Sequence, residues 1–337
     1  MKHARSRAKQ SFAAFCIAVA IFGCCGALAQ SPATARDAAA LTSEAERLLD
    51  ALQIPNDVFT AVADKLFQAI TLAPDYAKAY VQVCRLEIMG GLEVGRRFAP
   101  MSVETAEKAV LKALDLDPAD GYAWVLKAHL YVDRHRLSEA KAALNRAEKT
   151  GTDSPWLMLN WAEVFEEEGD LESAAQRYQA VLKSGTVNKR ALRYAYRQLT
   201  GYYVLKRDWD NAEAMHVAHK QIDPDDAWAP TNFAAALARA GQFARAIPRA
   251  REALRIKDYE AARRALAIAL FGQWATSIMQ GENTTDTAAY LSEARTIVPN
   301  LRQIALDTYP NINTRVISQA LIRQGLVDRE EIFRRPN

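Results

Sequence analysis

The chain has 337 residues, of which 50% are hydrophobic and 25% are charged, and its formal net charge is +3. This length and apolar content allow a large buried core. Without residues 1–29, which hold four basic residues and no acidic one, the formal charge becomes −1, so the balance gives no electrostatic basis for nucleic-acid binding.

Residues 1–29 have the pattern of a bacterial secretory signal peptide. A basic, acid-free start precedes an apolar, uncharged run over 12–26. Ala27-Leu28-Ala29 is a small-x-small cleavage site, which makes Gln30 the first residue of the mature chain. We therefore expect export to the periplasm, with no membrane span after cleavage. The basic residues are Lys2, Arg5, Arg7 and Lys9.

Two alternatives for the start of the chain stay open. An uncleaved signal would anchor the protein in the inner membrane, although the apolar run is short for a span. Ile21-Phe22-Gly23-Cys24 weakly resembles a lipobox, which would make an outer-membrane lipoprotein attached through Cys24, but Phe22 is bulky for that position. With residues 1–29 removed, Cys84 is the one remaining cysteine, so no internal disulfide is possible.

Residues 30–42 are interpreted as a polar leader and the start of a helix, roughly from Asp37. Ser43-x-x-Glu46 is a capping-box pattern at which that helix can restart. An atypical first repeat, 43–76, ends near Pro74. The second repeat, 77–120, is longer, and its excess lies at 89–100, which predicts an inserted loop that is either a binding loop or an inert insertion.

Residues 121–154 and 155–188 are two copies of one sequence repeat. Leu137 and Leu171, Ala140 and Ala174, and Ala128 and Ala162 are each 34 residues apart. Trp124, Ala128 and Tyr131 have the one-face spacing of an amphipathic helix, and the second half of each unit repeats it. A fixed period of this kind decides the fold, and each unit is predicted to be two antiparallel helices joined by a tight turn. Gly169 and Gly241 stand where the first helix of a unit ends.

The later units continue the pattern. Four extra residues, 189–192, precede the repeat at 193–226, which is followed by 227–260 and by a degenerate repeat at 268–301 with a polar turn at 281–287. The tail, 302–337, is predicted to cap the open end of the array. Its apolar residues include Val316, Ile317, Ala320, Leu321 and Leu326.

Over roughly residues 43–301 the pattern resembles the tetratricopeptide repeat (TPR) family, with Trp124, Ala128, Tyr131 and Ala140 among the matching positions. The closing proline of the pattern is replaced in three units by Thr152, Thr186 and Asp258. The resemblance implies an all-α fold: a right-handed TPR superhelix of about seven helix-turn-helix repeats with a C-terminal capping helical segment.

In this family the second, fifth, sixth and ninth positions of a repeat face a concave groove, where an Asn at the sixth commonly holds the backbone of a bound peptide. An amide both donates and accepts hydrogen bonds, and large aromatic side chains are typical interface anchors. The alternative is that these are surface or packing residues. Of a basic clamp for a terminal carboxylate, only Arg197 is present. The predicted groove residues are Trp156, Asn160, Glu163, Tyr194, Arg197, Gln198, Trp228, Thr231 and Asn232.

Glu213, His216 and His219 lie near one helical face and are a weak candidate for a metal site. Because the two histidines occupy packing positions, we interpret them as partly buried packing residues and expect no metal and no cofactor. No nucleophile elbow, phosphate loop or dinucleotide fingerprint is present, so no catalytic residue is assigned and no enzyme activity is expected.

The sequence therefore predicts a non-catalytic protein–protein interaction scaffold of the bacterial cell envelope, with a partner protein or peptide in its groove. By analogy, polysaccharide export, outer-membrane assembly or pilus assembly are its expected settings. Two alternatives stay open: a regulatory subunit of an envelope enzyme, and a structural homo-oligomer that self-associates through its ends.

Overall fold

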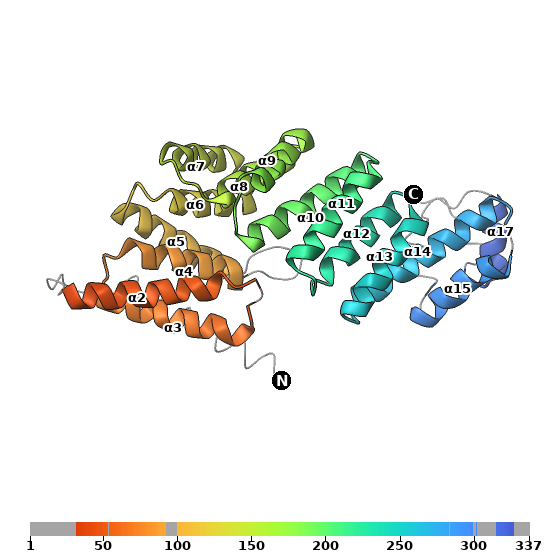
Figure 1. The fold of residues 1–337 in the computed structure, drawn as a ribbon, viewed down its shortest axis with the longest axis horizontal. Helices are drawn as coiled ribbons and strands as arrows, with labels where there is room; N and C mark the ends of the chain where they lie inside the picture. Colours follow the sequence, from red (N-terminus) through yellow and green to blue (C-terminus); the bar gives the residue numbers. More distant parts are fainter. Residues whose placement is uncertain are drawn as a thin grey trace. The chain divides into compact units, whose positions relative to one another are not determined.

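The computed structural model describes residues 32–52, 54–91, 100–282, 284–298, 301 and 315–326. Every regular element in this part is a helix, and successive helices pair along the chain (Figure 1), which confirms the predicted all-α repeat fold. Among these helices none is both long and apolar enough to cross a membrane. The predicted signal peptide, 1–29, and Pro299 lie outside the described residues.

Fourteen of the described helices follow each other as seven first-and-second pairs, and α17 comes last. The pairs are α2 (Pro32–Leu49) and α3 (Asn56–Leu72), α4 (Ala77–Gly90) and α5 (Pro100–Leu116), α6 (Gly121–Asp133) and α7 (Leu137–Lys149), α8 (Pro155–Glu167) and α9 (Leu171–Lys183), α10 (Lys189–Leu205) and α11 (Trp209–Ile222), α12 (Trp228–Arg239) and α13 (Phe243–Ile256), and α14 (Glu260–Met279) and α15 (Thr285–Ile297), with α17 at Arg315–Arg323.

Small residues lie where the helices of a pair approach each other. Ala128, Ala162 and Ala234 occupy equivalent positions of three first helices, and each is fully buried. A methyl group at these positions lets two helix axes come close together. Cys84, at the equivalent position of its own repeat, is also fully buried, and burial raises the pKa of its thiol well above the ordinary value.

The turn inside a repeat needs a left-handed residue. Gly169 and Gly241 have φ values of 80° and 74°, as predicted for the residue that ends a first helix. His135 and Arg207 have φ values of 55° and 57° at the equivalent positions of two other repeats. The next helix then starts at a capping residue, such as Asp170, whose carboxylate accepts a hydrogen bond from the backbone N–H of Ser173 at 3.0 Å.

The chain divides into two compact units, Met1–Leu192 and Arg193–Asn337, each with its own hydrophobic core. The first unit buries residues of α2 to α6, such as Leu49 and Leu66, and a further cluster lies between α6 and α8. The second unit buries residues of α12 to α15, such as Leu270 and Phe271. Leu321 and Leu326 join that core, so α17 packs on the last repeat pair.

Near the start of the chain, the bounds of the helices differ from the expected ones. Helix α2 begins at Pro32, within the predicted leader, and continues through 43–46 without a restart. Alanines between 33 and 45 favour a continuous helix, and Pro32 stands in the first turn, where a missing N–H is tolerated. Of the predicted inserted loop, 89–100, Met89 and Gly90 end α4 and Pro100 begins α5, while 92–99 lie outside the described residues.

Two later first helices are longer than predicted. Helix α10 includes the four residues 189–192 that the sequence suggested as an insertion before the repeat. Helix α14 begins at Glu260 instead of 268, because 261–267 consists of alanine, arginine and leucine, which are strong helix formers. Helix α15 begins at Thr285, inside the predicted turn, where the Thr284 hydroxyl accepts a hydrogen bond from the Thr287 N–H at 3.3 Å.

Candidate functional site

The predicted groove residues belong to the first helices of three repeats. Trp156, Asn160 and Glu163 lie on α8 in the first unit. The other six lie on α10 and α12 in the second unit. The predicted groove residues are therefore divided between the two units.

Trp228 is the most exposed aromatic side chain among the predicted residues. It is 58% exposed, and its ring packs against the ring of Tyr259 with 5.0 Å between the centroids. Its backbone N–H donates to Asp226 at 2.9 Å, which fixes the start of α12. Trp228 is thus held in place by its neighbours while much of its surface faces solvent.

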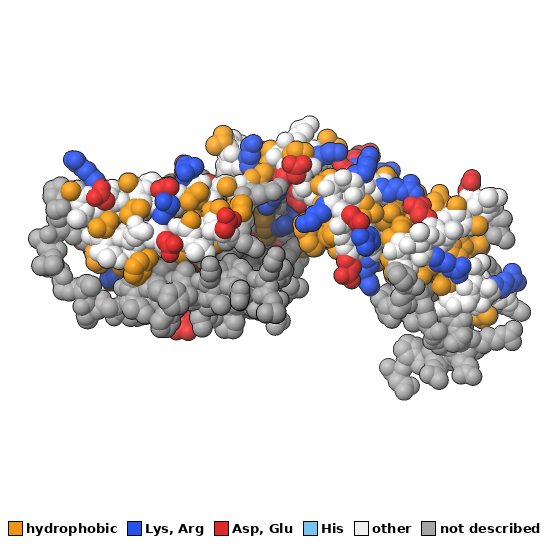
Figure 2. Space-filling view, turned by 90° about the horizontal axis from the view of Figure 1, so that it is seen from below, with side chains coloured by type: hydrophobic (Ala, Val, Ile, Leu, Met, Phe, Trp, Pro, Cys, Tyr) orange, Lys and Arg blue, Asp and Glu red, His pale blue; other side chains and the backbone are white. Residues whose placement is uncertain are grey.

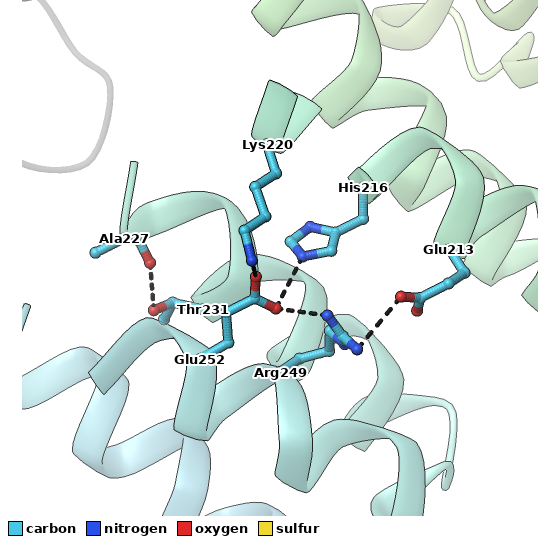
Figure 3. Close-up of polar contacts among 7 residues, drawn as sticks. All are labelled: Glu213, His216, Lys220, Ala227, Thr231, Arg249 and Glu252. Atoms are coloured by element: carbon cyan, nitrogen blue, oxygen red, sulfur yellow. Dashed lines mark hydrogen bonds and ion pairs between the residues drawn. The ribbon is translucent and has the colours of Figure 1, made fainter. Parts of the chain in front are cut away.

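Thr231 supports this aromatic pair and is itself buried, with 4% exposed. Its hydroxyl donates to the carbonyl of Ala227 at 2.8 Å (Figure 3) and lies 2.7 Å from the Tyr259 hydroxyl. Asn232, by contrast, is exposed and lies one helical turn after Trp228, on the same face of α12. Its amide is available to donate and to accept a hydrogen bond.

The predicted residues of α10 are half-buried. The guanidinium of Arg197 lies over the ring of Tyr194, 4.7 Å from its centroid. This cation–π contact orients Arg197, and Gln198 follows it on the helix. The three side chains therefore form a partly covered polar and aromatic strip along α10.

In the first unit, Asn160 is 3% exposed, unlike its sequence equivalent Asn232. Its Nδ2 donates to the carbonyl of Trp156 at 2.8 Å, and its Oδ1 lies 3.2 Å from Nδ1 of His129. The same Nδ1 lies 3.2 Å from Oε2 of Glu163. Asn160 is thus occupied within the protein and joins Glu163 in one cluster around His129.

Sequence reasoning missed His129, although a signal was present. His129 precedes Glu163 by one period of 34 residues, so it occupies the ninth position of its own repeat. Burial lowers the pKa of His129, but the charge of Glu163 and the hydrogen bonds to Glu163 and Asn160 raise it more, and the net pKa lies above the ordinary value. A positive charge on His129 therefore stabilises the cluster.

Glu213, His216 and His219 do not share a common centre. Nε2 of His216 lies 3.2 Å from Glu252 and Nε2 of His219 lies 3.1 Å from Asp226. Glu213 instead pairs with Arg249 at 3.3 Å (Figure 3). Across the described residues no group of three or more His, Cys, Asp or Glu side chains is arranged to hold a metal ion.

Glu252 is the centre of the polar cluster that these residues do form. It is 4% exposed, and its carboxylate accepts hydrogen bonds from Lys220 at 2.7 Å and from Arg249 at 2.5 Å (Figure 3). Burial raises the pKa of Glu252, but the hydrogen bonds from Lys220 and His216 lower it below the ordinary value. Because Lys220 and His216 lie on α11 and Glu252 lies on α13, the cluster joins two second helices.

No model of a protein family and no curated protein matches the chain. A chain of the Cut9–Hcn1 hetero-tetramer of the APC/C aligns with a TM-score of 0.56 and 15% identity over 69% of this chain and 43% of that one. Yeast Tom70 aligns with a TM-score of 0.51 and 16% identity over 94% of this chain and 62% of that one. The chain therefore spans less than two thirds of the length of each of these two matched chains.

Human IFIT1, solved as a dimer with PPP-AAAA, aligns with a TM-score of 0.52 and 13% identity over 88% of this chain and 70% of that one. Identities this low show the fold alone. Together with the seven helix pairs, these likenesses establish that the chain has the fold of a TPR solenoid.

Proposed function

We propose that this chain is a non-catalytic scaffold that binds a partner protein or peptide on the first helices of its repeats. Trp228 is the observation that carries the proposal, because it is 58% exposed and yet packs on Tyr259. A large aromatic side chain held in place at the surface is typical of an interface anchor, since little side-chain freedom is lost on binding. Asn232 adds hydrogen bonds to a peptide backbone beside it.

The remaining assignments follow from their environments. Tyr194, Arg197 and Gln198 extend the proposed contact surface along α10. In the first unit, Trp156 and Glu163 are half-buried and are proposed to contact the partner, whereas Asn160 positions His129. The Cut9–Hcn1 hetero-tetramer is an example of this fold in a complex of two different proteins, which supports a protein partner for this chain.

The test is site-specific cross-linking in cells. A photo-reactive phenylalanine analogue replaces Asn232, and the captured protein is compared in backgrounds with and without Trp228→Ala. We expect one defined adduct that the Trp228→Ala background loses. Val217→Ala, which trims a 45% exposed apolar side chain on the second helix α11, is the matched control and keeps the adduct.

An adduct that survives Trp228→Ala would place the partner elsewhere and overturn the groove assignment. If the adduct is lost in the Val217→Ala control as well as in Trp228→Ala, the loss would indicate a general effect on folding. Circular dichroism of each variant distinguishes loss of the contact from loss of folding, because a folded variant keeps its helical signal.

The second part of the proposal is export to the bacterial envelope through residues 1–29. It is supported by the basic start, the apolar run and the Ala27-Leu28-Ala29 site. Mass spectrometry of the protein from a periplasmic fraction is expected to give a chain that begins at Gln30. A lipid-modified chain beginning at Cys24, or an intact Met1, would replace the periplasmic assignment by one of the two anchored alternatives.

A further inference from the structure

Helix α13 borders a pocket that the proposed function does not use. The pocket has a volume of about 470 Å³, and its described lining comes from Ile247, Pro248, Arg251, Leu254 and Arg255. All five residues lie on the second helix of their repeat, whereas Trp228 lies on the first helix. The described lining thus combines three apolar side chains with two guanidinium groups.

The charges of α13 are not balanced at this pocket. The helix contains four arginines and a single acid, Glu252. That acid is buried and already accepts hydrogen bonds from Lys220 and Arg249. On the face shown in Figure 2, basic and acidic side chains both lie among apolar ones over the part of the molecule that α12 to α15 form in Figure 1. An acidic ligand is therefore the electrostatic complement of this helix.

The two arginines of the pocket differ in their partners. Arg251 donates to both carboxylate oxygens of Glu293, at 2.7 Å and 3.0 Å, so it is held against α15 and largely neutralised. Arg255 is exposed and makes no ion pair with any described residue. Arg255 is thus the uncompensated cation at the rim of the pocket.

We propose that the α13 pocket binds an acidic peptide segment of a partner protein that also carries an apolar side chain. The apolar side chain packs on Ile247, Pro248 and Leu254. A carboxylate of the peptide pairs with Arg255. The binding is independent of Trp228.

A peptide fits these features better than an anionic membrane does. Polybasic segments that bind acidic lipids use clusters of about four to eight lysines and arginines. This pocket has one uncompensated cation, and the carboxylate of Glu293 lies beside it.

The test measures fluorescence anisotropy of the full chain with a fluorescein-labelled Glu-Asp-Leu-Phe-Glu peptide and with its neutral counterpart, Gln-Asn-Leu-Phe-Gln. We expect the acidic peptide to bind about tenfold more tightly than the neutral one, and Arg255→Glu to weaken its binding by at least about tenfold. Arg245→Glu is the matched control, since Arg245 is an exposed arginine of α13 outside the pocket lining, and it leaves binding within about twofold.

The proposal is overturned if the acidic peptide does not bind, or if Arg245→Glu and Arg255→Glu weaken it equally, since equal effects mean unspecific attraction by charge. Binding of the full chain to vesicles of phosphatidylglycerol and phosphatidylcholine tests the lipid alternative. Vesicle binding that requires Arg255 and exceeds peptide binding would identify a lipid site instead. Trp228→Ala leaves peptide binding unchanged, so a failure of this site is distinguishable from a failure of the proposed function.

Discussion

At the scale of single residues, His129 and His216 both lie beside a glutamate, yet their pKa values move in opposite directions. His129 is half-buried, and its net pKa is raised, as the charge of Glu163 and two hydrogen bonds exceed the cost of burial. Burial dominates for His216, which is 2% exposed, and lowers its pKa despite the contact with Glu252. The positive charge of Arg249 also lowers it. The two residues therefore affect stability in opposite senses as pH changes.

For His129 we expect the stabilising contribution to be full below the ordinary pKa of 6.5 and to be lost as pH rises through the raised pKa of the folded protein. Denaturant unfolding of wild type and His129→Gln at about pH 6 and about pH 8 measures it, since both values bracket the ordinary histidine range. The free-energy difference between the two proteins should be larger at the lower pH. A difference that grows with pH would contradict the raised pKa.

His216 gives the opposite sign. Below the ordinary pKa of 6.5 the unfolded chain takes up a proton that the folded protein resists, so the free energy of unfolding falls as pH falls toward the lowered pKa. With 5 histidines in the chain, a pH titration of the ring C–H resonances can be assigned by single variants, beginning with His216→Gln. We expect the His216 resonance to titrate below 6.5. A midpoint above that value would show that its carboxylate neighbours dominate.

Substitution of Gly169 changes the backbone preference of the turn without disturbing side-chain packing. Its φ is 80°, and a Cβ placed on it meets no atom within 4 Å, so Gly169→Ala costs only the left-handed strain, about 1 kcal/mol. Gly201 is the matched control: it lies inside α10, and its added Cβ also meets no atom within 4 Å, so Gly201→Ala stabilises the helix by about 0.5–1 kcal/mol. Denaturant unfolding measures both. If both substitutions changed the free energy of unfolding in the same direction, the assignment of a left-handed backbone to Gly169 would be contradicted.

At the scale of the elements, Gly272 sets how closely α14 approaches α13. A Cβ added to Gly272 would overlap the ring of Phe243, which is itself 9% exposed. Gly272→Ala is therefore expected to destabilise the second unit by about 1–3 kcal/mol, the usual cost of overpacking a core. In a double-mutant cycle, Phe243→Leu should recover part of that loss, because it removes the ring that the methyl group meets. If the effects of the two substitutions on the free energy of unfolding were additive, the strain would not come from the contact between these two residues.

Much of the element pattern was predictable because the period of 34 residues is repeated at positions with a steric role. Ala128, Ala162 and Ala234 are all fully buried, as their shared position requires. The starts of α10 and α14 were not predictable from the period. Each helix continues in front of its repeat through residues that favour helix but do not belong to the repeated pattern.

The candidate site was less predictable, since exposure depends on the neighbouring repeat. Asn160 and Asn232 occupy one position of the pattern, but the residue 31 positions before Asn160 is His129, and the residue 31 positions before Asn232 is Gly201. His129 contacts Asn160, while Gly201 has no side chain to offer. A period identifies which positions are equivalent. The facing side chain of the preceding repeat decides whether such a position is buried or exposed.

At the scale of the whole molecule, the two cores share no residue. Leu66 is fully buried in the core of the first unit and Leu270 is fully buried in the core of the second. In repeat proteins each repeat contacts only its neighbours, so the effect of a cavity is expected to stay within its own unit. The independence of the two units can therefore be tested with one substitution in each.

Leu66→Ala and Leu270→Ala should each cost about 2–5 kcal/mol through lost burial and the cavity that remains. Hydrogen exchange followed by mass spectrometry is expected to show faster exchange within 32–192 for the first variant and within 193–326 for the second, because exchange reports local opening. Leu111→Ala is the control, as Leu111 is 46% exposed and its removal leaves no cavity. Faster exchange in both units after either core substitution would contradict the expected independence of the two cores.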